Sequence, residues 1–466
     1  MAAMISFGAD GWSARIDGDF NEENLVRVAD AAGRMWAQSD PGAIVYVGFD
    51  ARRDAERYAC LAGRVLASHG LVPMVSDRFC PTPALSWSVA RDVRACGGLQ
   101  VTGSHNPPDY LGVKLRMSRG GTPTDDEIEE LERLVDPEPT EGRGGIQRID
   151  MVTPYFDYLC STVDGDAIAR AAMDVVFDPL YGSSRGYVPF AMGALGLNVA
   201  EIHGEDDEDA PNVRPDPVEP WVDDCEQRVV ELGACAGLAM DGDADRAGAV
   251  DERGSYVHPH KIAAIVLKHL VERRGLTGRV VVTQSMSVLL KRVARSLGLR
   301  VTVKPVGFRY IVEEMSHEEV LMGAEESGSI AIPQLCPERD GVLTALLVCE
   351  CMAMAGKTLS ELVAELEDEF GRMSYGKRDM RAEPEEIEVF RTLLPGLNPQ
   401  TVVGRTPVNV SHMDGLKLEF DDGSWLLVRP SAAKSVVRVY AEAPTVEQRD
   451  ELLDAGCDLA LGEDPN

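Results

Sequence analysis

Residues 101–108 (VTGSHNPP) place a serine and a histidine side by side, directly after a glycine and ahead of two prolines. The prolines disfavour a helix or a regular strand here, and Gly103 lets the backbone turn sharply. The segment therefore predicts a tight loop that exposes the Ser104 hydroxyl beside His105. A hydroxyl presented in this way is a candidate for covalent catalysis.

Residues 241–246 (DGDADR) carry three carboxylates, Asp241, Asp243 and Asp245, which alternate with small residues after an apolar, strand-like run. Like charges this close together are costly unless a cation neutralises them. A site made of oxygen ligands alone suits Mg²⁺ or Mn²⁺. An EF-hand is excluded, because Arg246 stands where that loop requires glycine and no helix precedes it. The pattern favours a divalent-metal site over an acidic surface turn.

Two further patterns point to a polyol and to a phosphate. Glycines flank carboxylates and hydroxyls in residues 323–329 (GAEESGS), groups that bind sugar hydroxyls, although such turns are also common without a ligand. Residues 429–431 (RPS), with Lys434 and Arg438 beyond them, follow a strand-like run and offer the donors of a phosphate cradle. A plain basic turn fits the second pattern equally well.

Repeated strand–loop–helix units would position these groups. Apolar runs at 44–49, 174–177 and 280–283 each predict a buried strand, followed by a polar loop and a helix. Three such units indicate three similar α/β domains, in which ligands bind at the carboxyl ends of the strands.

Changes of composition mark the domain boundaries. Residues 136–145 are a polar linker rich in proline and glycine, and residues 376–384 turn charged again. A third boundary near 254–260 has weaker markers, Gly254 and Pro259. The expected domains are residues 1–145, 146–255, 256–375 and 376–466.

The composition limits the partners. The chain has 466 residues and a net charge of −31, which argues against nucleic acids and anionic membranes, because both need basic surfaces. An anionic substrate would need local basic residues to offset this acidic background. The ten cysteines show no metal-type CxxC pair, and neither a signal peptide nor an apolar run of about 20 residues is found. We therefore expect a cytoplasmic protein with reduced thiols, whose oligomeric state the sequence does not indicate.

Taken together, these residues resemble the α-D-phosphohexomutase family, which comprises phosphoglucomutases and phosphomannomutases. The resemblance covers nearly the whole chain and keeps the family's order. Residues 102–107 are similar to its phosphoserine loop, 241–246 to its metal loop, 323–328 to its sugar-recognition loop and 429–431 to its phosphate-binding loop. The resemblance implies an α/β fold, with three similar mixed α/β domains and a smaller α+β C-terminal domain around a central cleft.

The resemblance also implies a mutase that interconverts hexose 1-phosphate and hexose 6-phosphate, with glucose or mannose as the sugar. Ser104 would carry a phosphoryl group beside a Mg²⁺ ion held by Ser104, Asp241, Asp243 and Asp245, and a sugar 1,6-bisphosphate would be the primer. The implied catalytic residues are Ser104, His105, Lys114 and Arg15. His105 would transfer a proton or only order the loop. The implied substrate-binding residues are Arg246, Arg309, Glu325, Ser327, Arg429, Ser431, Lys434 and Arg438.

The sequence departs from the family pattern in the last loop, which usually reads Arg-Pro-Ser-Gly-Thr-Glu-Pro. Here residues 432–435 (AAKS) lack the threonine donor and the turn-forming glycine, although Lys434 adds a positive charge. Ser13 also stands where members often carry arginine, and Arg15 follows two residues on. A non-catalytic sugar-phosphate-binding or regulatory homologue is therefore an alternative, as is a mutase for a pentose or for glucosamine.

Two other enzyme classes are disfavoured. A Ser-His-Asp hydrolase would need the adjacent Ser104 and His105 to hydrogen-bond as nucleophile and base, which we expect to be difficult. A nucleotide-binding P-loop would need a glycine five residues before Gly356, and Cys351 occupies that position.

Overall fold

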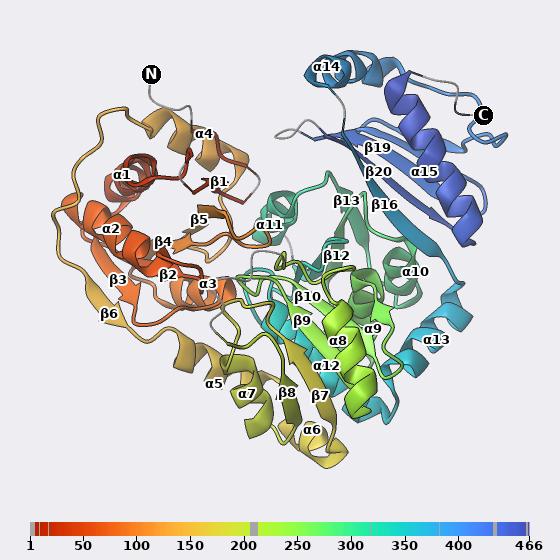
Figure 1. Cartoon of the computed structure of the whole chain (residues 1–466), viewed down its shortest axis with the longest axis horizontal. Coiled ribbons are helices and arrows are strands. Elements are labelled where there is room, and N and C mark those ends of the chain that lie inside the picture. Colours follow the sequence, from red (N-terminus) through yellow and green to blue (C-terminus); the bar gives the residue numbers. More distant parts are fainter. Residues whose placement is uncertain are drawn as a thin grey trace.

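The computed structural model of the chain describes residues 5–8, 10–16, 18–205, 213–317, 319–381, 383–431, 436–462 and 465. Its strands form four sheets that follow one another along the chain. Figure 1 shows the first and the last domain on opposite arms of the molecule, with the second and third domains between them.

The first domain has a six-stranded sheet with the order β1-β5-β4-β2-β3-β6. Its strands are β1 (Trp12–Arg15), β2 (Ile44–Phe49), β3 (Val72–Ser76), β4 (Ala95–Val101), β5 (Tyr110–Met117) and β6 (Gln147–Ile149). Its helices are α1 (Glu22–Ser39), α2 (Ala55–Ser68), α3 (Thr82–Arg91) and α4 (Asp125–Leu134). The apolar strand β2 is buried almost throughout, because α2 and α3 pack against it.

The second domain has a five-stranded sheet with the order β11-β10-β9-β7-β8. Its strands are β7 (Asp174–Asp178), β8 (Asn198–Glu201), β9 (Ala236–Met240), β10 (Ala247–Asp251) and β11 (Tyr256–Val257). Its helices are α5 (Val152–Thr162), α6 (Gly165–Ala171), α7 (Tyr187–Ala194) and α8 (Asp223–Leu232). Strands β9 and β10 are rich in alanine and glycine, and all of their residues are buried.

The third domain has a four-stranded sheet with the order β13-β12-β14-β15. Its strands are β12 (Arg279–Thr283), β13 (Val301–Lys304), β14 (Val320–Ala324) and β15 (Ile330–Ala331). Its helices are α9 (Pro259–Glu272), α10 (Val288–Ser296), α11 (Phe308–His317), α12 (Gly341–Ala355) and α13 (Leu359–Phe370). Helix α12 is apolar on all sides, and it is buried because it packs both on α9 and against β9, β10 and α6 of the second domain.

These three domains repeat one topology. In each, a central strand (β2, β7 or β12) runs parallel to both of its neighbours. The third strand of each unit (β4, β9 or β14) then pairs with an antiparallel strand that follows it in the chain. The prediction of three similar α/β domains is therefore confirmed. The repeat places the loops β4–β5, β9–β10 and β14–β15 at equivalent positions.

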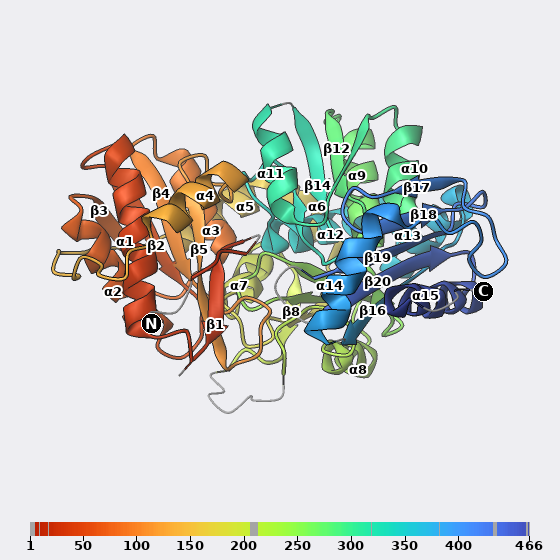
Figure 2. The same cartoon turned by 90° about the horizontal axis from the view of Figure 1, so that it is seen from above.

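The C-terminal domain is smaller and has an antiparallel sheet with the order β16-β20-β19-β18-β17. Its strands are β16 (Ser374–Arg381), β17 (Asn409–Ser411), β18 (Leu416–Glu419), β19 (Trp425–Pro430) and β20 (Val436–Ala443). Its helices are α14 (Pro384–Leu393), the 3₁₀ helix η1 (Leu394–Gly396) and α15 (Val446–Leu461). Helix α15 packs on the sheet, and Trp425, Leu427 and Tyr440 meet residues of the third domain. Figure 2 shows this domain beside the third domain and far from the first.

Edge strands cross the expected domain boundaries by a few residues. Strand β6 begins at Gln147 but pairs with β3 of the first sheet, and β11 begins at Tyr256 but pairs with β10 of the second. All ten cysteines are free thiols. No single helix among the described residues is long and apolar enough to span a membrane. Only α12 and α13 together reach that length, across a bend of 82°.

Candidate active site

The three equivalent loops meet at one place in the structure. We name them the serine loop (102–109), the metal loop (241–246) and the sugar loop (325–329). The Ser104 hydroxyl lies 3.2 Å from Asp241 Oδ2, which joins the serine loop to the metal loop. Ala247, which directly follows the metal loop, donates from its backbone N to Gly328 O at 3.2 Å and so joins the metal loop to the sugar loop. Domain repetition therefore brings residues from three parts of the chain to one site.

Ser104 adopts a left-handed backbone conformation, with φ of 47°, that is unusual for a residue other than glycine. Gly242 of the metal loop lies opposite Ser104, and a Cβ atom on Gly242 would lie only 2.6 Å from Ser104 O. Glycine at 242 therefore allows the two loops to touch. The Ser104 side chain is nearly buried and points at the metal loop.

The three carboxylates of the metal loop form a compact, buried group. One oxygen from each of Asp241, Asp243 and Asp245 lies within 4.8 Å of the others. Thr82, at the start of α3, donates from its hydroxyl to Asp243 Oδ2 at 2.5 Å. Asp243 Oδ1 and Asp245 Oδ1 are buried and have no hydrogen-bond partner among the described residues, although Arg246 Nε lies 4.0 Å from Asp245 Oδ1. Three buried carboxylates that converge in this way fit a hard divalent cation such as Mg²⁺.

Cations from other elements balance this negative charge. Lys114 Nζ lies 3.2 Å from Ser104 Oγ, 2.7 Å from Asp243 Oδ2 and 3.1 Å from Asp10 Oδ2, and it also contacts Asp245. Burial opposes a charge on Lys114, but Asp10, Asp243 and Asp245 outweigh it and raise the pKa of Lys114 above its usual value. Lys114 therefore stays protonated beside the serine.

Asp10 and Arg339 belong to the same cluster, although the sequence analysis did not single out either as a site residue. Arg339 Nη2 lies 2.8 Å from Asp245 Oδ2 and also pairs with Asp10, so it connects the third domain to the first two.

The surroundings shift the pKa values of Asp241 and Asp245, two carboxylates of the triad, in opposite directions. Burial, then Asp245 and Asp243, raises the pKa of Asp241 well above its usual value. Burial also opposes ionisation of Asp245, yet Arg339, Lys114 and Arg246 hold the pKa of Asp245 well below its usual value.

The side chain of Arg246 pairs with Asp216 of its own domain. Its Nη1 lies 3.6 Å from Asp216 Oδ1, and its backbone N donates to Asp241 Oδ1 at 3.0 Å. Arg246 therefore orders the metal loop and leaves its guanidinium beside the triad.

His105 contacts the serine more closely than we expected. Its Nδ1 lies 3.4 Å from Ser104 Oγ, so the expectation that adjacent residues would not hydrogen-bond was wrong. The left-handed turn at Ser104 brings the two side chains together. Burial, with the charges of Arg246, Arg214 and Lys114, lowers the pKa of His105 well below its usual value, so the imidazole is neutral. No carboxylate in the described part of the chain hydrogen-bonds to His105, which still argues against a Ser-His-Asp triad.

A second serine pattern in the second domain also carries no hydrolase chemistry. Residues 182–186 (GSSRG) match Gly-x-Ser-x-Gly between β7 and α7, a match that the sequence analysis missed. Ser184 is fully buried, and its hydroxyl has no hydrogen-bond partner in the part of the chain that the structure describes. It is therefore not exposed as a nucleophile.

The sugar loop places its polar groups next to the third domain's α11. Glu325 is nearly buried and accepts a hydrogen bond from Gly307 N at 3.1 Å. Glu326 accepts from Ser285 Oγ at 2.6 Å, and Ser327 Oγ lies 3.3 Å from Ser329 Oγ. Burial, then the charge of Glu326, raises the pKa of Glu325 to about 7.

Arg429 and Arg438 of the C-terminal domain lie on strands rather than in a loop. Strand β19 runs through Arg429 and Pro430, and Arg429 is paired with Arg438 on β20. Arg429 Nε lies 2.5 Å from Asp414 Oδ2, which also accepts from Val306 N of the third domain at 3.1 Å. Ser431 N donates to Val436 O at 2.8 Å. Lys434 lies outside the described residues.

Two predicted residues are held away from the serine in this structure. Arg15 pairs with Asp109 at 2.9 Å and is largely exposed. Arg309 pairs with Asp125 of the first domain at 3.1 Å, and its Nη2 lies 2.9 Å from the Tyr310 hydroxyl. Contacts recorded for the described residues join neither arginine to the triad or to Ser104.

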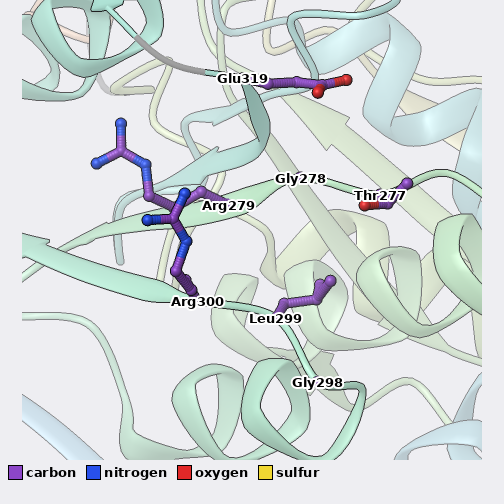
Figure 3. Close-up of a pocket in the computed structure, with 7 residues that line it drawn as sticks. All are labelled: Thr277, Gly278, Arg279, Gly298, Leu299, Arg300 and Glu319. Carbon is purple, nitrogen blue, oxygen red and sulfur yellow. The ribbon is translucent and has the colours of Figure 1, made fainter.

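A separate hollow of about 420 Å³ lies at the opposite ends of the third domain's strands. Figure 3 shows that Arg279 and Arg300 extend to the same side of it, near the starts of β12 and β13. This hollow lies away from the three loops, because those loops follow the carboxyl ends of strands.

Comparisons with known proteins match every domain. Four family models match in order: phosphoglucomutase/phosphomannomutase alpha/beta/alpha domain I over residues 4–141, domain II over 153–254, domain III over 258–370 and the C-terminal domain over 382–458. A phosphoglucomutase/phosphomannomutase of Thermococcus kodakarensis is 29% identical, with 97% of this chain and 98% of the relative covered. A phosphoglucosamine mutase of Moorella thermoacetica is 30% identical, over 96% and 97%.

A solved structure shows the same architecture. The crystal structure of a putative phosphomannomutase from Thermus thermophilus superimposes with a TM-score of 0.88 and 32% identity, and it covers 98% of this chain and 99% of its own. The two relatives and this structure are named for different sugars, so the comparisons support the reaction class more firmly than the sugar.

Proposed function

Since the chain belongs to the phosphoglucomutase/phosphomannomutase family and is therefore an intramolecular phosphotransferase, we propose that it interconverts hexose 1-phosphate and hexose 6-phosphate, with glucose or mannose as the sugar. The observation that carries this proposal is the contact between Ser104 and the metal loop. Ser104 Oγ lies 3.2 Å from both Asp241 Oδ2 and Lys114 Nζ. A hydroxyl between a carboxylate triad and a fixed ammonium is suited to carry a phosphoryl group.

Each half-reaction transfers one phosphoryl group. The bond from Ser104 Oγ to phosphorus breaks while a sugar hydroxyl oxygen bonds to phosphorus. The sugar hydroxyl gives up one proton and Ser104 Oγ takes up one, which leaves the free serine and the sugar 1,6-bisphosphate that also serves as primer. Its other phosphate then returns to Ser104. Lys114 donates a hydrogen bond to Ser104 Oγ, and the neutral His105 is placed to take or return the serine's proton.

Asp241, Asp243 and Asp245 would hold a Mg²⁺ ion in this proposal. When bound, the ion would neutralise the charge that develops during phosphoryl transfer. Asp245 stays ionised beside Arg339, and Thr82 fixes the orientation of Asp243.

The remaining predicted residues would bind the sugar and its second phosphate. Glu325 and Ser327 would hold sugar hydroxyls, and Arg429, Ser431, Lys434 and Arg438 would grip the phosphate that is not transferred. Arg429 is fixed by Asp414, which binds the third domain as well. Arg15, Arg246 and Arg309 would contribute positive charge around the substrate, which requires Arg15 and Arg309 to leave Asp109 and Asp125.

We also propose that the domains divide close to residues 145, 255 and 375. The ranges of the four matching family models support divisions in these regions.

The proposed role of Glu325 predicts a pH dependence. With a pKa of about 7, Glu325 is protonated below that pH and ionised above it. Protonation replaces an acceptor by a donor, so the side chain accepts fewer hydrogen bonds from sugar hydroxyls. We expect kcat/KM to fall as pH is lowered through about 7, since kcat/KM reports the free enzyme.

The variant Glu325→Gln is the control for this pH dependence. Its kcat/KM should be lower at pH 8 but should lack the decline that belongs to Glu325. The substrate phosphate also titrates near pH 6, but equally in both enzymes, so the two profiles are compared directly. Identical pH slopes for the two enzymes would show that Glu325 is not the titrating group.

A substrate panel tests the proposed function. The enzyme, primed with a sugar 1,6-bisphosphate, is offered the 1-phosphates of glucose, mannose, glucosamine and ribose. We expect glucose or mannose 1-phosphate to be converted with a kcat/KM at least about 10-fold above the others, the scale on which binding pockets separate similar substrates. Turnover of none of them, with no phosphoryl group on Ser104, would favour a non-catalytic sugar-phosphate binder instead.

Glucosamine is the second candidate sugar. The phosphoglucosamine mutase of Moorella thermoacetica matches this chain as closely as the named phosphoglucomutase/phosphomannomutase does. A kcat/KM highest for glucosamine 1-phosphate would replace glucose and mannose in the proposal while keeping its mechanism. A preference for ribose 1-phosphate would identify a pentose mutase.

A further inference from the structure

The guanidinium group of Arg52 donates hydrogen bonds to backbone carbonyls of the serine loop. Arg52 Nη2 donates to Ser104 O at 2.8 Å and to Asn106 O at 2.5 Å. Arg52 Nη1 donates to Pro107 O at 2.6 Å and to Tyr110 O at 2.9 Å. One guanidinium group therefore binds three carbonyls of this loop and one at the start of β5, a fork geometry that lysine does not have.

Asp50 holds both Arg52 and the start of the serine loop. Asp50 directly follows β2, and its carboxylate is buried. Asp50 Oδ1 accepts from Arg52 N at 3.0 Å. Its Oδ2 accepts from Thr102 Oγ1 at 2.7 Å and from Gly103 N at 2.9 Å. Thr102 Oγ1 in turn accepts from Ser104 N at 2.8 Å. Hydrogen bonds thus fix the loop on both sides of Ser104.

Gly103 is the position that allows Arg52 to approach. A Cβ atom on Gly103 would lie 2.1 Å from Arg52 Cζ, well inside van der Waals contact. Ser104, directly after it, holds its left-handed conformation at φ of 47°. A strained conformation of this kind persists only where the surrounding structure enforces it, and the Arg52 guanidinium is, with Asp50 and Thr102, one of the groups that enforce it here.

The other two similar domains use the same arrangement. In each, the loop after the central strand supports the loop after the third strand. Ser183 N donates to Gly242 O at 2.9 Å in the second domain, and Ser285 Oγ donates to Glu326 Oε2 at 2.6 Å in the third. Arg52 occupies the corresponding loop of the first domain, after β2.

Arg52 does not face the reacting groups. It lines a cavity of about 1200 Å³ between the first two domains, whose lining includes Asp50 and Gly242 but neither Ser104, Lys114 nor the three carboxylates. Among the described residues, the hydrogen bonds of the Arg52 guanidinium connect it to the reacting groups through the serine loop, while its charge also acts on Asp241 and Asp243.

We propose that Arg52 is a positioning residue for phosphoryl transfer: it holds Ser104 in the conformation that aims its hydroxyl at the metal loop. This inference rests on the proposed function above. It assigns to Arg52 an effect on kcat through geometry, without contact to the sugar phosphate. The exposed neighbour Arg53 on the same loop serves as the matched control.

The test compares Arg52→Ala, Arg52→Lys and Arg53→Ala. We expect Arg52→Ala to lower kcat by about 10²-fold, the scale of a small misplacement of a reacting group, with KM changed by less than about 3-fold. Arg52→Lys keeps the charge but not the fork, so it should lose nearly as much. Arg53→Ala should match the wild type. Added guanidinium ion should restore part of the activity of Arg52→Ala.

A second variant tests the geometry with Arg52 present. Gly103→Ala should displace the guanidinium and lower kcat to a similar extent, but it should cost little more when combined with Arg52→Ala, because the two changes remove one arrangement. Independent, multiplicative losses would overturn the proposal. So would Arg52→Ala and Arg52→Lys with kcat within about 3-fold of wild type.

The failure of the proposed function is recognised separately. If the wild type neither turns over any sugar phosphate nor accepts a phosphoryl group from a sugar 1,6-bisphosphate, the proposed function fails. If the wild type does both and Arg52→Lys, which keeps the charge, does so equally well, only the role of Arg52 fails.

Discussion

Replacement of Ser104 by alanine is expected to lower kcat by roughly 10⁴-fold or more, the scale observed when a covalent nucleophile is removed. Ser104 Oγ is the one atom that would carry the phosphoryl group between the two half-reactions. Its contacts with Asp241 and Lys114 are two among several made by each partner, so the cluster remains paired without it. The substitution should therefore remove catalysis and leave the fold unchanged.

Intact-mass measurement provides the readout for this prediction. After incubation with a sugar 1,6-bisphosphate, the wild type should gain one phosphoryl group, and Ser104→Ala should gain none. Ser118→Ala, an exposed serine in the turn after β5, is the matched control and should behave as the wild type. A Ser104→Ala enzyme that keeps more than a few per cent of the wild-type kcat would contradict the role of Ser104.

Local patterns in the sequence were sufficient to single out the three loops that meet in the candidate active site. Strand β2 spans the predicted residues 44–49, because a continuous apolar run between polar turns has few other structures available. The spacing of the three carboxylates predicted their convergence, and the structure brings them within 4.8 Å. The repeated strand–loop–helix units predicted three similar domains, which the repeated sheet topology confirms.

Residues that support the site from a distance could not be found in this way. Arg339 pairs with Asp10 across 329 residues of sequence, and Thr82 binds Asp243 across 161. Each is a single polar residue without a local pattern, so only the packing of the domains shows its role. Arg52 lies in the polar loop after the predicted strand 44–49, but its four carbonyl contacts depend on the folded path of the serine loop.

The structure also answers how an acidic chain could bind an anion. The chain has a net charge of −31, yet Lys114, Arg246 and Arg339 surround the metal loop and Arg52 lies behind the serine loop. Buried cations act at short range in a medium less polar than water, so they dominate the local field. A net negative charge is therefore compatible with the proposed binding of phosphate groups at this site.

Removal of divalent metal is expected to lower kcat by about 10³-fold, because a bound cation supplies several kcal/mol of charge stabilisation in phosphoryl transfer. Asp243→Asn should weaken Mg²⁺ binding by more than about 10²-fold, since even residues that only support metal ligands contribute 10- to 100-fold. Asp223→Asn, an exposed carboxylate of the same domain on α8, is the matched control and should bind Mg²⁺ as the wild type does.

Because the pKa of Asp241 is raised, the affinity for Mg²⁺ should depend on pH. Burial and the charges of Asp245 and Asp243 favour the protonated form of Asp241 in the metal-free protein. Mg²⁺ binds the ionised carboxylate, so binding releases a proton. The affinity for Mg²⁺ should therefore rise with pH until it passes the raised pKa, and then level off. Titration calorimetry in two buffers of different ionisation enthalpy measures the released proton. An Mg²⁺ affinity that is independent of pH, or that survives Asp243→Asn, would show that the three carboxylates do not form the metal site.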